Sequence, residues 1–163
     1  MMSASRARTI FLTAGAALAL DQTSKSMALA ALQPHVPVDV TPFFALSLGF
    51  NTGVSFGMLA SDANTFRMPL IVLTLVIIVA LAVMAMRATT LERVALSAII
   101  GGAAGNLTDR IWRGRVTDFI DLFVADWHWP AFNLADTAIT LGVVTLLWAS
   151  LRRDTQQQAE SDR

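Results

Sequence analysis

Four apolar stretches of the sequence are separated by polar segments. The longest runs from Met68 to Met86 without a charged residue and lies between Arg67 and Arg87. A helix of about 19 residues is roughly 28 Å long, which matches the hydrocarbon thickness of a bilayer. The other three stretches are shorter and span residues 9–20, 94–108 and 137–151. The pattern therefore predicts an α-helical integral membrane protein with four transmembrane helices, three of which carry polar residues at one end.

The charged residues that bracket the shorter stretches predict where polar groups gather. Arg93 and Asp109 lie 16 positions apart, and so do Asp136 and Arg152. At about 1.5 Å per residue, each pair spans about 24 Å of helix. Because consecutive membrane helices run antiparallel, we expect Asp109 and Asp136 to lie at one level, together with Asp21 at the end of the first stretch. Acids from three helices at one level are typical of a functional site.

The arginines predict an orientation in the membrane. Those near one set of helix ends are Arg6, Arg8, Arg87, Arg93, Arg152 and Arg153. By the positive-inside rule this side is cytoplasmic, so we expect both termini there and the acids at the periplasmic or outer face. The bias is incomplete, because five basic residues fall on the other side, namely Lys25, Arg67, Arg110, Arg113 and Arg115. A cleavable signal peptide is the less favoured alternative for the N-terminus, since Asp21 and Lys25 fit poorly before a cleavage site.

Two segments on the non-cytoplasmic side differ from the helices. Residues 33–66 contain three prolines and alternating valines from Val36 to Val40, a pattern that predicts short strands lying against lipid. Residues 110–135 contain three tryptophans, which are suited to the membrane interface. Residues 1–153 are expected to form a single membrane domain, and residues 154–163 a polar, disordered cytoplasmic tail.

Composition narrows the possible chemistry. The chain is 55% hydrophobic and 15% charged with a formal net charge of zero, which excludes the basic surface of a nucleic-acid-binding protein. It has no cysteine, so thiol catalysis and disulfides are excluded. Its two histidines, His35 and His128, do not lie in a zinc-binding spacing. We therefore expect neither a metal nor a cofactor.

Two aspartates in short polar motifs are the strongest candidates for catalysis. Asp118 lies in Val-Thr-Asp-Phe, and Asp136 ends Phe-Asn-Leu-Ala-Asp just before the last apolar stretch. Amide hydrolysis without a metal, serine or cysteine needs a base that activates water and an acid that protonates the leaving nitrogen. Two close carboxylates that share a proton can do both. The sequence thus predicts an aspartic membrane peptidase, and it leaves open which of the two acids is the base.

Five motifs in order resemble those of one known family. They are residues 21–25 (DQTSK), 51–56 (NTGVSF) and 101–110 (GGAAGNLTDR), followed by the motifs of Asp118 and Asp136. Together with the four apolar stretches, they resemble lipoprotein signal peptidase, the bacterial signal peptidase II family, over residues 8–152. Each motif alone is weak, whereas five in this order and spacing are specific.

The resemblance implies an activity and a fold. Members of the family are aspartic endopeptidases of the bacterial cytoplasmic (inner) membrane, and they cleave prolipoproteins N-terminal to a diacylglyceryl-modified cysteine. The family fold has four transmembrane helices, a small non-cytoplasmic β-cradle and a short outer helix. The partners implied in the same way are lipidated prolipoprotein substrates, membrane lipid and inhibitors of the globomycin type.

Residue roles carry over by position in the motifs. The resemblance assigns catalysis to Asp118 and Asp136. It assigns substrate binding or support to Asp21, Lys25, Asn51, Gly53, Asn106, Asp109, Arg110 and Asn133. The spacing of Asn133, three residues before Asp136, predicts that it orients the acids. For Asn106 two interpretations stay open, one in which it faces the site and one in which it bonds a neighbouring helix.

Some of these residues also have purely structural interpretations. Asp21 with Lys25, and Asp109 with Arg110, are alternatively ion pairs that take no part in catalysis. The G-x-x-x-G motif at residues 101–105 favours close helix packing. The acids expected to be solvated in loops are Asp121 and Asp126.

Two other classes of function compete with a peptidase. Acids within a membrane also occur in proton-coupled transporters, but no span is interrupted and no internal repeat appears. A scaffold that associates through G-x-x-x-G leaves Asp118 and Asp136 unexplained.

Overall fold

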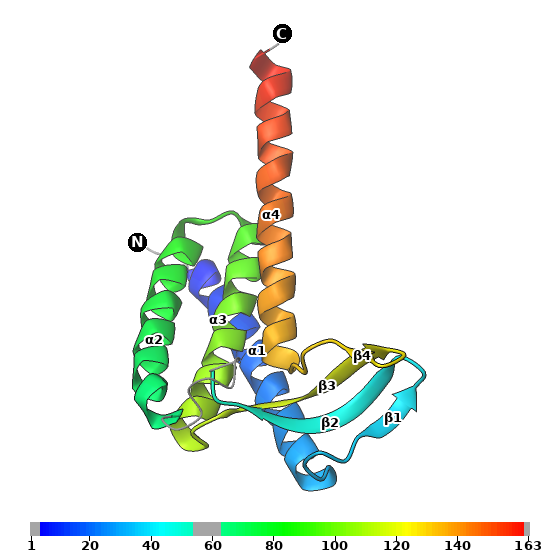
Figure 1. Ribbon diagram of the computed structural model, residues 1–163. Coiled ribbons are helices and arrows are strands. Elements are labelled where there is room, and N and C mark those ends of the chain that lie inside the picture. Colours follow the sequence, from blue (N-terminus) through cyan, green and yellow to red (C-terminus); the bar gives the residue numbers. More distant parts are fainter. Residues whose placement is uncertain (1–3, 54–62, 162–163) are drawn as a thin grey trace.

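The computed structural model describes residues 4–53 and 63–161. The helices are α1 (Ala4–Ala31), α2 (Ala63–Arg87), α3 (Thr90–Trp112) and α4 (Leu134–Ser161). The strands are β1 (Val38–Thr41), β2 (Phe44–Asn51), β3 (Val116–Val124) and β4 (Trp127–His128), which form one sheet in that order. The helices form a bundle, and the sheet lies across one end of it, next to the C-terminal half of α1 and the start of α4 (Figure 1).

Helix α3 packs against each of the other three helices, and small residues make this possible. A Cβ atom added to Gly101 would lie 2.7 Å from the Cβ of Ala17 on α1. One added to Gly102 would lie 2.5 Å from the carbonyl oxygen of Ala135 on α4. Both distances are too short for carbon, so the glycines let the backbones approach closely. The close packing predicted from residues 101–105 is confirmed, and it brings α1 and α4 onto the same central helix.

The outer surface of the bundle is apolar, whereas its interior contains charged groups. Phe11 on α1 is 78% exposed, and α2 exposes leucine, isoleucine and valine along its length. Within the described helices, Arg67–Arg87 and Leu134–Arg152 are long and apolar enough to cross a membrane, with mean hydropathies of 2.9 and 1.6. Helices α1 and α3 are less apolar because they bury charged side chains in the bundle. These are Asp21, Lys25, Arg93 and Asp109.

The sheet confirms the short strands predicted after residue 33. Strands β1 and β2 pair antiparallel, with Pro42 in the turn between them. Strand β2 pairs in turn with β3, so that Gly49 lies opposite Asp118. A register shift between Leu46 and Gly49 interrupts this ladder just beside Asp118. Such irregularities bend a strand and change the direction of its side chains, and they are frequent next to active sites.

Helix α4 differs from the expectation at its C-terminal end. Residues 154–163 were expected to be disordered, yet α4 continues as helix to Ser161 and projects beyond the other helices (Figure 1). Residues 154–161 contain neither glycine nor proline, and five of these eight residues are Gln, Ala or Glu, which have high helix propensity. Polarity alone is therefore a poor guide to the end of this helix.

Two further expectations concern the segment after α3. Asp121 lies within β3, not in a loop, and its carboxylate contacts His128 Nδ1 at 2.9 Å. Because residues two apart in a strand share a face, Asp121 lies on the same face as Phe123, which pairs with His128 of β4. The sequence did not predict this short strand. Among the described residues there is no further helix, so the short outer helix implied by the resemblance stays a prediction. Residues 54–62, part of the segment predicted as strands, lie outside the described residues.

Candidate functional site

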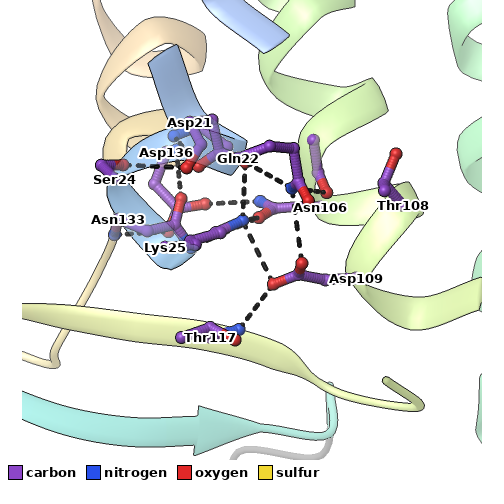
Figure 2. Close-up of polar contacts among 12 residues, drawn as sticks. Asp21, Gln22, Ser24, Lys25, Asn106, Thr108, Asp109, Thr117, Asn133 and Asp136 are labelled. Atoms are coloured by element: carbon purple, nitrogen blue, oxygen red, sulfur yellow. Dashed lines mark hydrogen bonds and ion pairs between the residues drawn. The ribbon is translucent and has the colours of Figure 1, made fainter. Parts of the chain in front are cut away.

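The predicted site residues come together where the helices meet the sheet. Lys25 Nζ on α1 lies 2.9 Å from Asp21 Oδ2 and 3.4 Å from Asp109 Oδ2 on α3. The backbone N–H of Ala135, next to Asp136 on α4, donates to Asp21 Oδ1 at 2.9 Å. Figure 2 shows Lys25 reaching towards Asn106 and Asp109. The predicted convergence of three acids from three helices is thus present in the structure.

Asn133 joins the two candidate catalytic acids. Its side-chain amide donates to Asp118 Oδ1 at 2.6 Å, while its Oδ1 accepts from the backbone N–H of Asp136 at 3.0 Å. In return, the backbone N–H of Asn133 donates to Asp136 Oδ2 at 3.2 Å. Asn133 thereby caps helix α4, and Asp136 occupies the third position of a reciprocal capping box. Because Asn133 is fully buried, it holds Asp136 of α4 and Asp118 of β3 in one fixed arrangement.

Asn106 of α3 supports the same arrangement from the other side. Its Nδ2 donates to Asp136 Oδ1 at 2.8 Å. Its Oδ1 accepts from Lys25 Nζ at 2.9 Å and from Asn133 Nδ2 at 3.3 Å. Since the lysine can only donate, it fixes which end of the Asn106 amide faces Asp136. Of the two interpretations left open by the sequence, the structure has Asn106 facing the site.

Asp118 has an electrostatic environment unlike that of a surface carboxylate. Its side chain lies on β3, and the residue is 5% exposed. Burial, together with the nearby charge of Asp136, raises the pKa of the Asp118 carboxyl to about 6, against the lowering effect of the hydrogen bond from Asn133. Two carboxyl groups close enough to influence each other do not ionise independently. The pair can therefore retain one proton close to neutral pH.

Two buried acids hold the backbone next to the two candidate catalytic acids. Asp109 Oδ2 accepts from the backbone N–H of Thr117, the residue before Asp118, at 2.8 Å. Asp21 binds the N–H of Ala135, the residue before Asp136, as described above. Lys25 lies between these two carboxylates and, like them, is fully buried. The structure thus uses the same arrangement at both candidate acids. In each case a buried carboxylate accepts a hydrogen bond from the backbone N–H of the residue before the acid.

Further polar residues complete this buried cluster. Arg113 forms an ion pair with Asp109, four residues earlier on α3. The side-chain amide of Gln22 donates to Asp21 Oδ2 at 3.0 Å and to the Gly105 carbonyl at 3.1 Å. A Cβ atom on Gly105 would collide with the Asp21 carboxylate, so this position allows the acid to lie against α3. Sequence reasoning missed Arg113 and Gln22, although the i, i+4 spacing from Asp109 was a usable signal for the arginine.

Asp109 and Arg110 do not form the ion pair that was considered from the sequence. Within the described part of the chain, the bases paired with Asp109 are Lys25 and Arg113. Adjacent residues on a helix point in different directions, which explains the separation. The charge of Arg110 acts on Asp136 and Asp118 more than on Asp109, so the side chain belongs to the edge of the site.

Asn51 and Gly53 lie at the end of β2, beside the candidate acids. Asn51 Oδ1 accepts from the backbone N–H of Gly53 at 2.7 Å, and its side chain also bonds Asp118. Gly53 has a φ of 87°, in the left-handed region that favours glycine. A Cβ atom here would also lie 2.5 Å from Leu70 Cδ1. All eight supporting residues predicted from the sequence therefore lie in or beside the one polar cluster.

Two apolar grooves open beside the candidate acids. One, of about 340 Å³, lies between α4 and the sheet and includes Asp136 together with Thr140 and Trp129. The other, of about 260 Å³, lies between the C-terminal half of α1 and the sheet, where Met27 and Phe119 line it. Carboxyl groups next to apolar grooves are suited to the hydrolysis of a substrate with apolar parts. Among the described residues no group of three His, Cys, Asp or Glu could hold a metal ion.

Comparison with known proteins gives the family of the chain. The sequence pattern of the signal peptidase (SPase) II family matches residues 13–152. The lipoprotein signal peptidase of Polynucleobacter necessarius subsp. necessarius is 43% identical over 146 residues, which cover 88% of this chain and 90% of that protein. That of Azoarcus sp. (strain BH72) is 45% identical over 141 residues, covering 85% of this chain and 80% of that protein.

Solved structures give the same result for the fold. A bacterial membrane enzyme solved by the in meso method at 2.3 Å resolution matches with a TM-score of 0.79 and 28% identity, over 91% of this chain and 90% of that one. A second, at 1.9 Å resolution, matches with a TM-score of 0.78 and 28% identity, over 88% and 92% of the two chains. The chain therefore belongs to the signal peptidase II family, the membrane-embedded aspartic proteases that remove signal peptides from prolipoproteins.

Proposed function

We propose that Asp118 and Asp136 are the catalytic dyad of a lipoprotein signal peptidase. In this proposal they hydrolyse the peptide bond N-terminal to a diacylglyceryl-modified cysteine. The observation that carries the proposal is the position of Asn133, which bonds both acids and joins β3 to the first turn of α4. Two carboxyl groups linked through one buried amide, and open to an apolar groove, are the arrangement that this hydrolysis requires.

The dyad accounts for both proton transfers of amide hydrolysis. One carboxylate takes a proton from water while the oxygen attacks the scissile carbonyl. The protonated partner donates its proton to the developing oxyanion, which gives a neutral diol. The first acid then passes the proton taken from water to the leaving nitrogen as the C–N bond breaks, and the partner recovers a proton from the diol as the carbonyl re-forms, so that the pair again holds one proton. The raised pKa of Asp118 supports a retained proton near neutral pH. The two acids act as one titrating unit, so no separate role is assigned to either.

The supporting residues act in three groups. Asn106 and Asn133 contact the acids and orient them. Asp21, Lys25 and Asp109 position the peptide groups on which the acids are carried. The third set lies at the open edge of the site and is available for the substrate backbone. Its members are Asn51, Gly53 and Arg110.

The substrate lipid and the signal peptide supply the apolar parts that the grooves accommodate. The groove along α4 contains Asp136 itself, so an apolar chain held there lies next to the reacting bond. Trp129 on its rim is 55% exposed and is suited to the membrane interface. Membrane lipid is the natural surrounding of these surfaces, and inhibitors of the globomycin type would compete for the same grooves.

The same proposal includes a topology. Helices of 23 to 28 residues are at least about 34 Å long, so each of the four is long enough to cross the hydrocarbon core. The sheet is then the β-cradle at the periplasmic face of the cytoplasmic membrane, with the dyad above it and both termini in the cytoplasm. The arginines at the opposite ends of the helices support this orientation.

A matched pair of precursors tests the proposed substrate. The purified protein is given one prolipoprotein in two forms, the first diacylglyceryl-modified and the second with its target cysteine changed to serine. An acyl chain contributes about 0.8 kcal/mol per buried CH₂, so the lipidated form should be cleaved and the unmodified form cleaved poorly or not at all. Equal rates would show that the enzyme reads sequence alone, and the proposed specificity would be wrong.

A further inference from the structure

A third apolar groove lies outside the region around the dyad. The groove, of about 410 Å³, runs along α1 from Ala7 to Leu18 and is completed by Ala82 and Met86 of α2 and by Gly101 of α3. Small residues on α1 and α3 leave this space. A Cβ atom added to Gly15 would meet no atom within 4 Å, so the groove is open at its centre. We call this space the α1–α2 groove.

The α1–α2 groove begins far from the catalytic acids. Ala7, at one end of the groove, and Lys25, at the polar cluster, are 18 positions apart on the same helix. At about 1.5 Å per residue they are separated by about 27 Å. A molecule that enters at Ala7 therefore approaches from the side opposite the sheet. Its position requires no contact with a substrate held at Asp118 and Asp136.

Basic side chains surround this end of the groove. Arg6 directly precedes Ala7, is exposed, and donates from Nη1 to the carbonyl of Met86 at 3.3 Å. Arg87, also exposed, directly follows Met86 at the end of α2. A guanidinium has five N–H donors in a fork that fits the oxygens of a phosphate. An apolar space that opens between exposed arginines at a membrane surface has the chemistry of a phospholipid, with acyl chain inside and phosphate at the rim.

We propose that the α1–α2 groove binds one anionic phospholipid of the surrounding bilayer. One acyl chain fills the groove beside Gly15, and the phosphate lies between Arg6 and Arg87. A second copy of this chain is a poorer occupant. Copies inserted with the same orientation bring their arginines to the same level, so that like charges would face each other at the contact. The lipid, in contrast, supplies negative charge where the arginines lie.

Native mass spectrometry of the purified full-length protein in detergent tests the proposal. The probes are phosphatidylglycerol, which is anionic, and phosphatidylcholine, which has no net charge. Wild-type protein should retain one phosphatidylglycerol in preference to phosphatidylcholine. Gly15→Leu places a side chain inside the groove and should abolish the retained lipid. The matched control is Ala16→Leu, which adds the same side chain at an exposed position of the same helix that does not line the groove.

A second variant protects the test against misfolding of Gly15→Leu. Arg6→Gln removes charge at an exposed position and should lower the preference for phosphatidylglycerol about tenfold, as expected for the loss of a hydrogen bond to a charged group. Equal lipid retention by wild type, Gly15→Leu and Arg6→Gln would overturn the proposal. So would a protein dimer that Gly15→Leu dissociates, because the groove would then hold a second copy. These readouts are independent of peptidase activity, so failure of the proposed catalysis would leave them unchanged.

Discussion

At the scale of single residues, the site depends on amides that lie between carboxylates. Asn133 bonds Asp118 with one end of its side chain and the backbone of Asp136 with the other. Asn106 is oriented by Lys25, so that its N–H group faces Asp136. In each amide, a neighbour that can only donate or only accept determines where the side-chain oxygen and nitrogen lie. The acids are therefore held in place before a substrate arrives, which is the condition for efficient acid–base catalysis.

The pH dependence of cleavage should reflect the proton held by the dyad. Because burial raises the pKa of Asp118 to about 6, the singly protonated pair becomes less populated as the pH rises above that value. We expect kcat/KM to fall on the alkaline side with an apparent pKa near 6. The hydrogen bond from Asn133 lowers the pKa of Asp118, so its loss should move this limb to higher pH.

Asn133→Ser is the variant that isolates this effect. Serine still caps a helix, but its side chain is too short to reproduce the amide contact with Asp118. Rates measured across the pH range for wild type and variant give the comparison. A limb that moves to lower pH in Asn133→Ser, or a wild-type profile without an alkaline limb, would contradict the proton assignment.

The sequence predicted the side chains of the site better than their partners. Asn133 and Asp136 were linked by their spacing alone, since residues three apart share a helix face. The bonds from Asp109 to the N–H of Thr117, and from Asp21 to the N–H of Ala135, could not be predicted. Their donors are backbone groups, which every residue carries, and only the tertiary arrangement selects which of them face a buried acid.

At the scale of elements, the apolar runs located the helices correctly, but the length predicted from the first run is too short. The first run ends at Leu20, whereas α1 extends from Ala4 to Ala31. Hydrophobicity falls where α1 turns Asp21 and Lys25 towards α3, yet the backbone remains helical. Strand β3 was missed for a similar reason. Asp118 is buried in it, which hides the alternation of apolar and polar residues that otherwise predicts a strand.

Lys25 should be the main electrostatic link between α1 and α3. Among the described residues, Lys25→Met leaves buried Asp21 without an ion-pair partner and buried Asp109 with Arg113 alone. An uncompensated buried charge costs about 3–5 kcal/mol, so the variant should unfold at a clearly lower temperature than wild type in detergent. The double variant Lys25→Met with Asp21→Asn restores the charge balance and should recover part of the loss. A double variant less stable than Lys25→Met would argue against charge pairing as the role of this lysine.

At the scale of the whole molecule, polarity is distributed as the bilayer requires. Exposed surfaces of the helices are apolar, and charged residues are paired inside the bundle or lie near the helix ends. Composition and motif order were sufficient to predict a membrane peptidase of the signal peptidase II family. They could not predict the helical continuation of α4 to Ser161, because that polar stretch gives no apolar periodicity to follow.

Reporter fusions test the orientation of the whole molecule. Fusions after Arg87 and after Asp154 should report a cytoplasmic position, because arginines gather near these helix ends. A fusion at Asp126, in the turn between β3 and β4, should report a periplasmic position. A cytoplasmic signal at Asp126 would put the sheet and the dyad on the wrong side of the membrane for exported substrates.

The most direct test of the account is cleavage of a lipidated precursor by purified Asp118→Asn and Asp136→Asn variants. General acid–base groups contribute about 10²–10⁴-fold to such rates, so each variant should lose at least about a hundredfold in kcat while it inserts and folds normally. The matched control is Asp121→Asn on the same strand as Asp118, where the acid pairs with His128 away from the site, and its rate should stay near that of wild type. Near-normal turnover by a well-folded Asp118→Asn or Asp136→Asn variant would contradict the dyad.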